Sequence, residues 1–306
     1  MAAGTLTFVG AAQAEPEVTA EDVEAAFHDV ETVAEQVNAL DERIDAAQAQ
    51  IADLDDDVAA QQRLYEEQRT ELGATIVQQQ MDAPLGPTVN LLGSEDPQEF
   101  LEGLGAVQAL NSTRADALED FTRTARELEN RQAKLRDRVA ELKRTRTELD
   151  EKRAEMRSGY EEARDQLEQL SQPEQATFNA SNDQVKVTAP GDASARAKQI
   201  IAFASSQLGD PYVYGGTGPD GWDCSGLVQA SYAAAGVSLP RVVGPQYAAM
   251  TSVPIGQAQP GDVVFFPDMS HDGIYIGNGQ VIHAPRPGKN VEVTTLGIGF
   301  TLAGRV

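Results

Sequence analysis

Apolar residues recur every seven positions along the N-terminal part of the chain. From about Val18 to Met81, valine, isoleucine, tyrosine or leucine stands at positions 23, 30, 37, 44, 51, 58, 65 and 72, and no proline interrupts the pattern. A seam kept in register over this length specifies a supercoiled helix rather than a helix of a globular core. At 1.5 Å per residue, this helix would be on the order of 90 Å long.

A second seam follows a break at residues 83–97 that is rich in proline and glycine. Over roughly 97–171, apolar residues again stand at sevens: Phe121, Leu128, Leu135, Leu142, Leu149, Met156, Ala163 and Leu170. Two such helices joined by a short break predict an antiparallel hairpin. The seams weaken at polar positions, so we expect imperfect pairing; these positions are Gln61, Gln68, Arg114, Arg146 and Arg153.

The break and the start of the second helix are more apolar than a bare turn requires. We therefore expect an apolar tip that docks on a partner or on the protein's own C-terminal part. Its residues are Val89, Leu91, Leu92, Phe100, Leu101 and Leu104.

The pattern changes after Pro173, and the change divides the chain. Residues 17–172 form the predicted coiled-coil arm, and residues 173–193, rich in small and polar residues, are predicted to be a linker. Residues 194–306 combine short helices, near 195–208 and after Cys224, with later strand patterns near 263–266, 271–276, 280–284 and 291–294. Helices followed by an antiparallel sheet predict an α+β domain.

Acidic residues are concentrated in the arm. Residues 1–193 contain 18 Lys and Arg against 41 Asp and Glu, whereas residues 194–306 contain 6 against 7. A field of this sign repels nucleic acid and disfavours anionic membrane surfaces. We therefore exclude a nucleic-acid function.

The start of the chain has features of an export signal. An apolar stretch is followed by Ala12-Gln13-Ala14, a cleavage-site pattern, although the positively charged start typical of such signals is missing. We expect residues 1–16 to be a signal-peptide remnant and the protein to be secreted or held in the cell envelope. No apolar run is long enough to span a bilayer.

The chain's single cysteine lies in Asp223-Cys224-Ser225-Gly226, after a glycine-rich loop and at the head of a predicted helix that stops at Gly236. Unpaired N–H groups and the positive end of the helix dipole favour a thiolate there. A lone cysteine can also be an inert, buried, small apolar residue.

Two histidines are placed to serve such a thiolate. His271 and His283 are twelve residues apart, with Asn278-Gly279 as a hairpin turn between them. Even offsets along both strands return their side chains to one sheet face, so the rings can be neighbours. We predict that His271, at a sheet edge, is the base that takes and returns the thiol proton, and that His283 holds its tautomer.

A Cys/His/His zinc site is the alternative interpretation of these three residues. No second cysteine and no short ligand spacing supports it. A thiol enzyme of the predicted type needs no metal or other cofactor.

Ordered motifs in residues 194–306 resemble those of the NlpC/P60 cysteine peptidases, which implies a papain-like α+β domain. The coiled-coil arm is similar to that of secreted peptidoglycan hydrolases of corynebacteria and mycobacteria. The motifs are Pro211-Tyr212-Val213-Tyr214-Gly215-Gly216, Trp222-Asp223-Cys224-Ser225-Gly226-Leu227-Val228, Leu239-Pro240-Arg241, Pro260-Gly261-Asp262-Val263-Val264-Phe265-Phe266, Ser270-His271, Gly273-Ile274-Tyr275-Ile276-Gly277-Asn278-Gly279 and Ile282-His283-Ala284.

The resemblance implies the same roles for Cys224, His271 and His283 as nucleophile, base and orienting residue. Tyr212 matches a family tyrosine near the nucleophile, and its hydroxyl is expected to help the Cys224 N–H stabilise the oxyanion. One departure is Asp272, where the family usually has an apolar residue. On a strand its side chain should face away from His271, and if it instead folds back it would raise the pKa of that histidine.

Asp223 and Ser225 flank the nucleophile, and the resemblance implies that they bind the amino end of a stem peptide. Simpler roles stay open, with Asp223 as a helix cap, Ser225 as a first-turn residue without a ligand, and Tyr212 as a core residue. Arg241 and Gln246 match the family pattern loosely and are assigned no role.

We therefore predict a peptidoglycan endopeptidase; the resemblance implies cleavage between D-glutamate and meso-diaminopimelate. The arm is expected to cover the cleft until a membrane-protein partner at the division site pulls it away. One alternative is a non-catalytic scaffold that activates another cell-wall hydrolase. Another is an acyl- or amidotransferase with the same triad.

Overall fold

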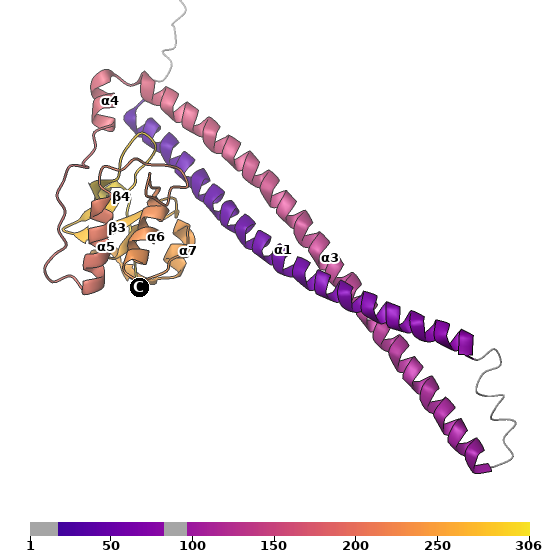
Figure 1. Cartoon of the computed structure of the whole chain (residues 1–306). Coiled ribbons are helices and arrows are strands. Elements are labelled where there is room, and N and C mark those ends of the chain that lie inside the picture. The colour runs from indigo at the N-terminus through magenta and orange to yellow at the C-terminus, as the bar shows by residue number, and fades with distance from the viewer. Residues whose placement is uncertain (1–17, 83–96) are drawn as a thin grey trace, which may run out of the picture. The chain divides into compact units, whose positions relative to one another are not determined.

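Two long helices form the arm in this computed structural model, which describes residues 18–82 and 97–306. Helix α1 spans Ala20–Asp82 and helix α3 spans Pro97–Gln169 (Figure 1). Asp41 pairs with Arg153 and Asp57 pairs with Arg131, so the partner's number falls as the α1 number rises. The predicted antiparallel coiled-coil hairpin is confirmed. None of the described helices is both long and apolar enough to cross a membrane.

The chain divides into two compact units, residues 43–146 and the remainder. Within residues 43–146, the polar seam position Gln61 donates a hydrogen bond to the backbone oxygen of Thr124, and Tyr65 stacks on Phe121 with ring centroids 5.1 Å apart. The polar seam position Gln61 is therefore satisfied by a hydrogen bond, whereas Oε1 of Gln68 is buried without a hydrogen-bond partner among the described residues. The predicted signal remnant and the side chains of the predicted apolar tip lie outside the described residues.

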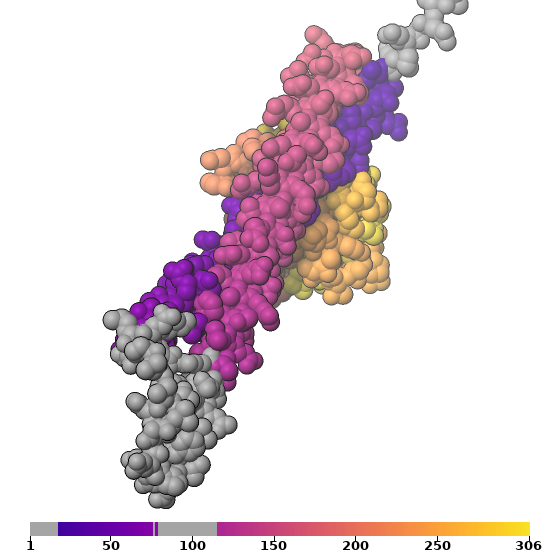
Figure 2. Space-filling view, turned by 90° about the vertical axis from the view of Figure 1, so that its right-hand side faces the viewer, coloured from indigo at the N-terminus to yellow at the C-terminus, as the bar shows by residue number. Residues whose placement is uncertain are grey.

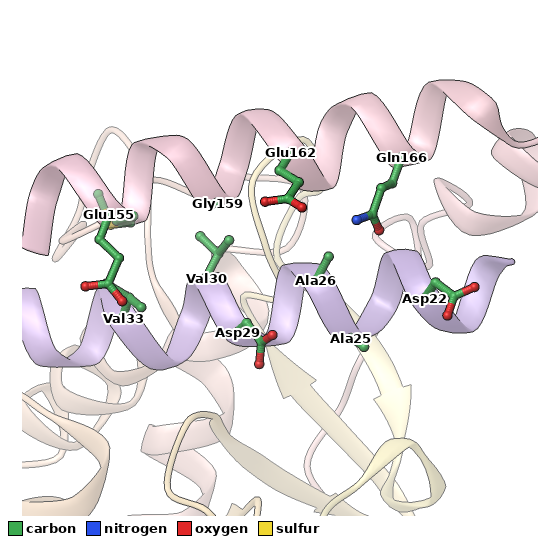
Figure 3. A pocket seen from close by; sticks show the side chains of 11 residues that line it. Asp22, Ala25, Ala26, Asp29, Val30, Val33, Glu155, Gly159, Glu162 and Gln166 are labelled. Carbon is green, nitrogen blue, oxygen red and sulfur yellow. The ribbon is translucent and has the colours of Figure 1, made fainter. Parts of the chain in front are cut away.

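In the other unit, the first turns of α1 lie alongside the end of α3 (Figure 2). Val23 and Phe27 pack there with Ala163 and Leu170. Gly159 allows the close approach, since a Cβ at this position would lie 3.1 Å from a methyl group of Val30. The groove beside Gly159 is lined largely by carboxylates and small side chains of the two helices (Figure 3).

The C-terminal domain is built on a six-stranded antiparallel sheet with the strand order β1-β6-β2-β3-β4-β5. Its two central strands and their neighbours carry valine, isoleucine and phenylalanine, which suit a pleated and buried surface. The strands are β1 (Thr251–Pro254), β2 (Val263–Phe265), β3 (Asp272–Gly277), β4 (Gln280–His283), β5 (Glu292–Thr295) and β6 (Leu302–Arg305).

Helices α5 (Ala195–Ser206) and α6 (Cys224–Ala234) pack on each other and on β3. The core between them is contiguous and contains the fully buried side chains of Ile201, Leu227 and Ile274. The predicted α+β domain is thereby confirmed. A further short helix, α7, spans Val243–Ala248.

The stretch predicted as a linker contains ordered structure. Helix α4 spans Gln172–Phe178, with Ser171 and Glu174 forming a capping box. Beyond it, Ser181 and the backbone N–H of Asn182 donate hydrogen bonds to Glu292 on β5. This part of the chain therefore contacts the edge strand β5, although most of its residues are exposed to solvent.

Besides α4, one helix and two strands were not expected from the sequence, namely α7, β1 and β6. Their runs are four to six residues long and lack clear alternation, so their pairing partners rather than their own pattern define them. One expectation was wrong: β3, which follows His271, lies between β2 and β4 in the interior of the sheet and not at its edge. Gly273 within β3 instead allows close packing against β4, since a Cβ there would lie 2.6 Å from a methyl group of Val281.

We predict that Gly226→Ala strongly destabilises the C-terminal domain. A Cβ at this position would lie 2.1 Å from the backbone oxygen of Gly216, so the loop must move. Overpacking of this kind costs about 1–3 kcal/mol. Denaturant unfolding followed by the fluorescence of Trp222, the chain's single tryptophan, measures the loss. Gly256→Ala is the matched control because nothing lies within 4 Å of its Cβ position; equal stability of the two variants would contradict the prediction.

Candidate active site

Cys224 is the first residue of α6 and is only 3% exposed. Asp223 caps the helix, with its carboxylate accepting a 2.7 Å hydrogen bond from the N–H of Gly226. This cap places the sulfur where the free N–H groups of the first turn converge.

The carboxylate of Asp223 is also held by a cation. Arg241 donates hydrogen bonds from both terminal nitrogens to Asp223 and a further one, 2.8 Å long, to the hydroxyl of Ser225. Gln246 on α7 donates to the backbone oxygen of Ser225. The two residues that flank Cys224 are therefore fixed in a buried polar network, to which Arg241 contributes three hydrogen bonds.

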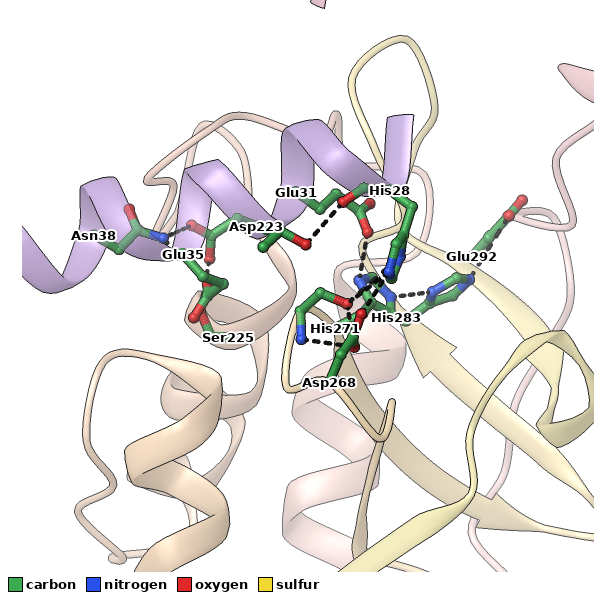
Figure 4. Close-up of polar contacts among 12 residues, drawn as sticks. His28, Glu31, Glu35, Asn38, Asp223, Ser225, Asp268, His271, His283 and Glu292 are labelled. Carbon is green, nitrogen blue, oxygen red and sulfur yellow. Dashed lines mark hydrogen bonds and ion pairs between the residues drawn. The ribbon is translucent and has the colours of Figure 1, made fainter. Parts of the chain in front are cut away.

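His271 and His283 form a hydrogen-bonded pair. Nε2 of His271 lies 2.8 Å from Nδ1 of His283, and the two rings are nearly perpendicular (Figure 4). Both rings pack against Phe300. The pairing of β3 with β4 brings the histidines together, since Ile274 stands opposite Ile282.

Glu292 on β5 lies beyond His283, opposite it in the strand register, with Oε1 3.8 Å from Nε2. Lys289 binds the same carboxylate. Burial, followed by the nearby His271 and Lys289, holds the pKa of His283 well below its usual value. His283 is therefore a neutral ring suited to orienting His271 rather than to carrying a proton.

Tyr212 is buried in the same core cluster as Cys224. Burial and then the negative charge that Cys224 would carry raise the pKa of Tyr212 well above its usual value. Its hydroxyl therefore stays protonated and available as a donor beside the sulfur.

Three polar residues of α1 reach the same polar groups from the arm. Glu31 places Oε2 3.4 Å from Nδ1 of His271, and Asn38 donates a 3.1 Å hydrogen bond to Asp223 (Figure 4). Glu35 accepts hydrogen bonds from the hydroxyl of Ser225 at 2.8 Å and from the backbone N–H of Val243 at 2.7 Å. Positions 31, 35 and 38 share one helix face, so one side of α1 fills the site.

These contacts change the protonation of the site. Burial lowers the pKa of His271, but the nearby negative charges, first Glu31 and then Asp272 and Glu35, together outweigh burial, so the net pKa is raised. Burial raises the pKa of Cys224 well above its usual value, and the charges of Asp272, Glu35, Asp223 and Glu31 raise it further. The thiolate predicted from the helix start is therefore a thiol in this arrangement, because four carboxyl groups and burial outweigh the helix dipole.

The structure thus brings His271 and His283 together and places Cys224, Tyr212, Asp223 and Ser225 around the start of α6. His271 Nδ1 forms no hydrogen bond to the Cys224 sulfur; the charged group beside it is Glu31. No group of three or more His, Cys, Asp or Glu side chains within the described ranges is arranged to hold a metal ion.

The model of the NlpC/P60 family matches residues 209–300, which contain this whole arrangement apart from the α1 residues. The C-terminal part of the chain belongs to the NlpC/P60 family. The matched residues run from the turn after α5 to the end of the loop before β6.

Three relatives illustrate the similarity of this NlpC/P60 domain. The probable endopeptidase p60 of Listeria monocytogenes is 52% identical over 88 residues, which are 28% of this chain and 18% of that protein. The gamma-D-glutamyl-L-lysine dipeptidyl-peptidase of Bacillus subtilis is 38% identical over 106 residues, 33% of this chain and 36% of that one. The structure of RipD from Mycobacterium tuberculosis, described as a non-catalytic, peptidoglycan-binding NlpC/P60 protein, is 30% identical, with a TM-score of 0.34 and coverage of 37% and 99%.

The chain therefore spans about a fifth to a third of the curated relatives it matches. The similarity concerns the NlpC/P60 domain and leaves the arm outside it.

The sequence did not single out several residues that shape the site. Arg241 follows Leu239-Pro240 in one of the motifs that resemble the NlpC/P60 family, and this position could have identified it as a residue of the site. Glu292 gave no signal, because only strand pairing places it beside His283. Glu31 and Asn38, both buried, are indistinguishable in sequence from the solvated residues of an acidic helix.

We predict that docking of α1 on the site weakens as pH rises from about 4.5 to about 7. Burial and then the charge of Asp223 raise the pKa of Glu35 from 4.5 to about 7, so the docked state holds this proton more tightly than the free helix does. Docking is therefore fully favoured below the pKa that Glu35 has in the free helix. It is lost progressively as pH rises through the pKa that Glu35 has in the docked state. Hydrogen exchange at the Val243 N–H, which Glu35 holds, measures this; its protection should fall by up to about tenfold per pH unit.

Glu35→Gln should flatten this dependence, because an amide does not ionise. Glu42→Gln, at an exposed position of α1, is the control and should behave like the parent protein. A Val243 protection factor that is independent of pH in the parent protein would show the prediction to be wrong.

Proposed function

We propose that this protein hydrolyses amide bonds in peptidoglycan stem peptides by nucleophilic attack of the Cys224 thiolate. The observation that carries the proposal is the hydrogen-bonded His271–His283 pair, which lies in one NlpC/P60 domain with a cysteine at a helix start. A cysteine, a base and a group that orients the base form the minimal set for thiol catalysis.

The tautomers follow from the hydrogen bonds. For Nδ1 of His271 to accept the thiol proton, its Nε2 must carry hydrogen and donate to Nδ1 of His283. Nε2 of His283 then carries the hydrogen that faces Glu292. This chain of groups keeps the accepting nitrogen of His271 free for Cys224.

The reaction would then proceed in two stages. The sulfur attacks the carbonyl carbon, with the Cys224 N–H and the Tyr212 hydroxyl donating to the oxyanion. His271 gives its proton to the leaving amine as the C–N bond breaks, and water, deprotonated by the same ring, cleaves the thioester. No metal or cofactor takes part in these steps.

We propose a γ-D-glutamyl bond to meso-diaminopimelate as the scissile bond. The family resemblance and the γ-glutamyl activity named for the B. subtilis relative support it. Asp223 and Ser225 would bind the amino end of the stem peptide, and the amide N–H of Asn38 already donates to Asp223 as a substrate amine would.

We propose further that α1 inhibits the enzyme by occupying this site. Glu31 faces the nitrogen of His271 that should accept the proton, and Glu35 and Asn38 use the polar groups beside Cys224. A stem peptide cannot bind until this stretch of α1 leaves. We propose that a membrane protein of the division machinery, acting on the coiled coil of an exported protein, removes it; the acidic arm and the export-signal pattern at the N-terminus motivate this part.

The alternative is a binding protein or scaffold with a dead catalytic domain. The specific observation in its favour is that Cys224 is buried with its pKa raised well above the usual value. The two proposals differ in whether moving α1 away restores a reactive thiolate.

The decisive experiment compares muropeptide release by full-length proteins. Asn38→Asp replaces the donor to Asp223 with a second carboxylate, whose repulsion should displace α1. Gln36→Glu adds the same charge at an exposed position of α1 and is the matched control. We expect Asn38→Asp to raise the release rate by about tenfold or more, since a like-charge pair in a partly buried site exceeds the ~1.4 kcal/mol that a tenfold change requires.

Three further outcomes separate the proposals. Adding Cys224→Ala to Asn38→Asp should abolish release, because the chain has no other thiol. Equal rates for Asn38→Asp and Gln36→Glu would refute inhibition by α1. Absence of release from every folded variant, with binding to peptidoglycan retained, would establish the scaffold.

A further inference from the structure

Asp272 is a buried acid that the mechanism above does not use. It is the first residue of β3, pairs with Phe265 on β2 and is fully buried. Alternation along the strand puts its side chain on the same face as Ile274 and Ile276, which pack in the core cluster that contains Cys224. Its carboxyl group therefore lies on the α6 side of the sheet, where the nucleophile is.

This carboxyl group has no partner. Neither of its oxygens makes a hydrogen bond within the part of the chain that the structure describes. The nearest strong cation, Arg241, is already engaged by Asp223 and Ser225. A buried carboxylate without a hydrogen bond or a cation is costly, so the group favours its neutral form.

The charged groups around Asp272 come from three directions. Glu35 faces it from α1, Asp223 and Cys224 from the start of α6, and Arg241 and His271 from the loops beside them. Burial, followed by the charge of Glu35, raises the pKa of Asp272 well above its usual value, against the opposing effects of His271 and Arg241.

The effect of Asp272 on the pKa of Cys224 matters most for the chemistry of the site. After burial, Asp272 contributes more than any other charge to the raised pKa of Cys224. Glu31 and Glu35 belong to α1 and would leave with it, and the charge of Asp223 is offset by Arg241. Asp272 is then the unpaired acid that stays beside the sulfur.

We propose that Asp272 is a positioning residue that restrains the nucleophile: one negative charge is shared between its carboxyl group and the sulfur, so that Cys224 becomes a thiolate only while Asp272 is protonated. Two anions in one buried site exclude each other, and the pair titrates as a unit. This inference rests on the proposed function of Cys224. It implies that, once α1 has left, ionisation of Asp272 as pH rises holds back formation of the Cys224 thiolate, so that the sulfur reacts more slowly at neutral and alkaline pH than it would beside a neutral side chain.

Alkylation of Cys224 by iodoacetamide tests the inference, because the chain has a single cysteine. Rates are measured between pH 5 and pH 9 on full-length Asn38→Asp protein, with and without Asp272→Asn. Asp192→Asn, which removes one charge from an exposed turn, is the matched control. We expect Asp272→Asn to raise the alkylation rate at pH 8 by on the order of tenfold, the effect of one pKa unit, with little change at pH 5.

Several outcomes would overturn the inference. Superimposable pH profiles with and without Asp272→Asn, or slower alkylation at pH 8 in that variant, would each do so. A purely structural role would change the unfolding midpoint but not the shape of the profile. Asp272→Val, which places an apolar side chain at this position, gives the same comparison if Asp272→Asn fails to fold.

Muropeptide release measured on the same variants separates this inference from the proposed function. A shifted alkylation profile without any release would disprove hydrolysis and leave the role of Asp272 intact. Continued release together with unchanged alkylation profiles would support hydrolysis and disprove the role of Asp272.

Discussion

The chemistry of the site depends on the burial of several carboxyl groups close to the sulfur atom of Cys224. Asp272, Glu35, Asp223 and Glu31 all raise the pKa of Cys224, and the site holds one strong cation in direct contact with them, Arg241, bonded to Asp223. A thiolate in that surrounding would add charge to a region that already disfavours it. The state of the nucleophile is therefore set by which carboxyl groups are present and protonated.

Two of those groups come from α1, and this connects the arm to the chemistry. Glu31 and Glu35 lie one helical turn apart on the face that meets the NlpC/P60 domain, and Asn38 continues the same face. The contacts that these three residues make are polar, and the arm adds aromatic contacts, between His28 and Phe266 and between Tyr160 and Tyr214. A polar contact that depends on a carboxyl group with a raised pKa can be broken by a modest change in charge or pH. A purely apolar contact would not respond to such a change.

A second set of contacts fixes this stretch of α1 at a distance from the sulfur. The guanidinium group of Arg286, three residues after His283, lies 4.5 Å from the ring of Phe27 and 4.2 Å from the ring of Phe178. His28 pairs with Asp268, two residues before Ser270. The loop that precedes His271 and the loop that follows His283 are thus held by contacts with α1 as well.

The sequence by itself determined the periodic and local features of the protein. Heptad spacing determined the two arm helices, because a seven-residue repeat can be buried only along a supercoil. The glycine-rich loop, the cap at Asp223 and the Asn278-Gly279 turn located the cysteine helix and the histidine hairpin, since backbone geometry there depends on single residues. Only the tertiary structure decided that Glu31 and Asn38 are buried and Glu35 half-buried in the site, that Glu292 stands beside His283, and that the carboxyl group of Asp272 makes no hydrogen bond within the described residues. These facts depend on contacts between residues distant in sequence, and an acidic residue on a helix or strand has the same local pattern whether water or a nucleophile lies in front of it.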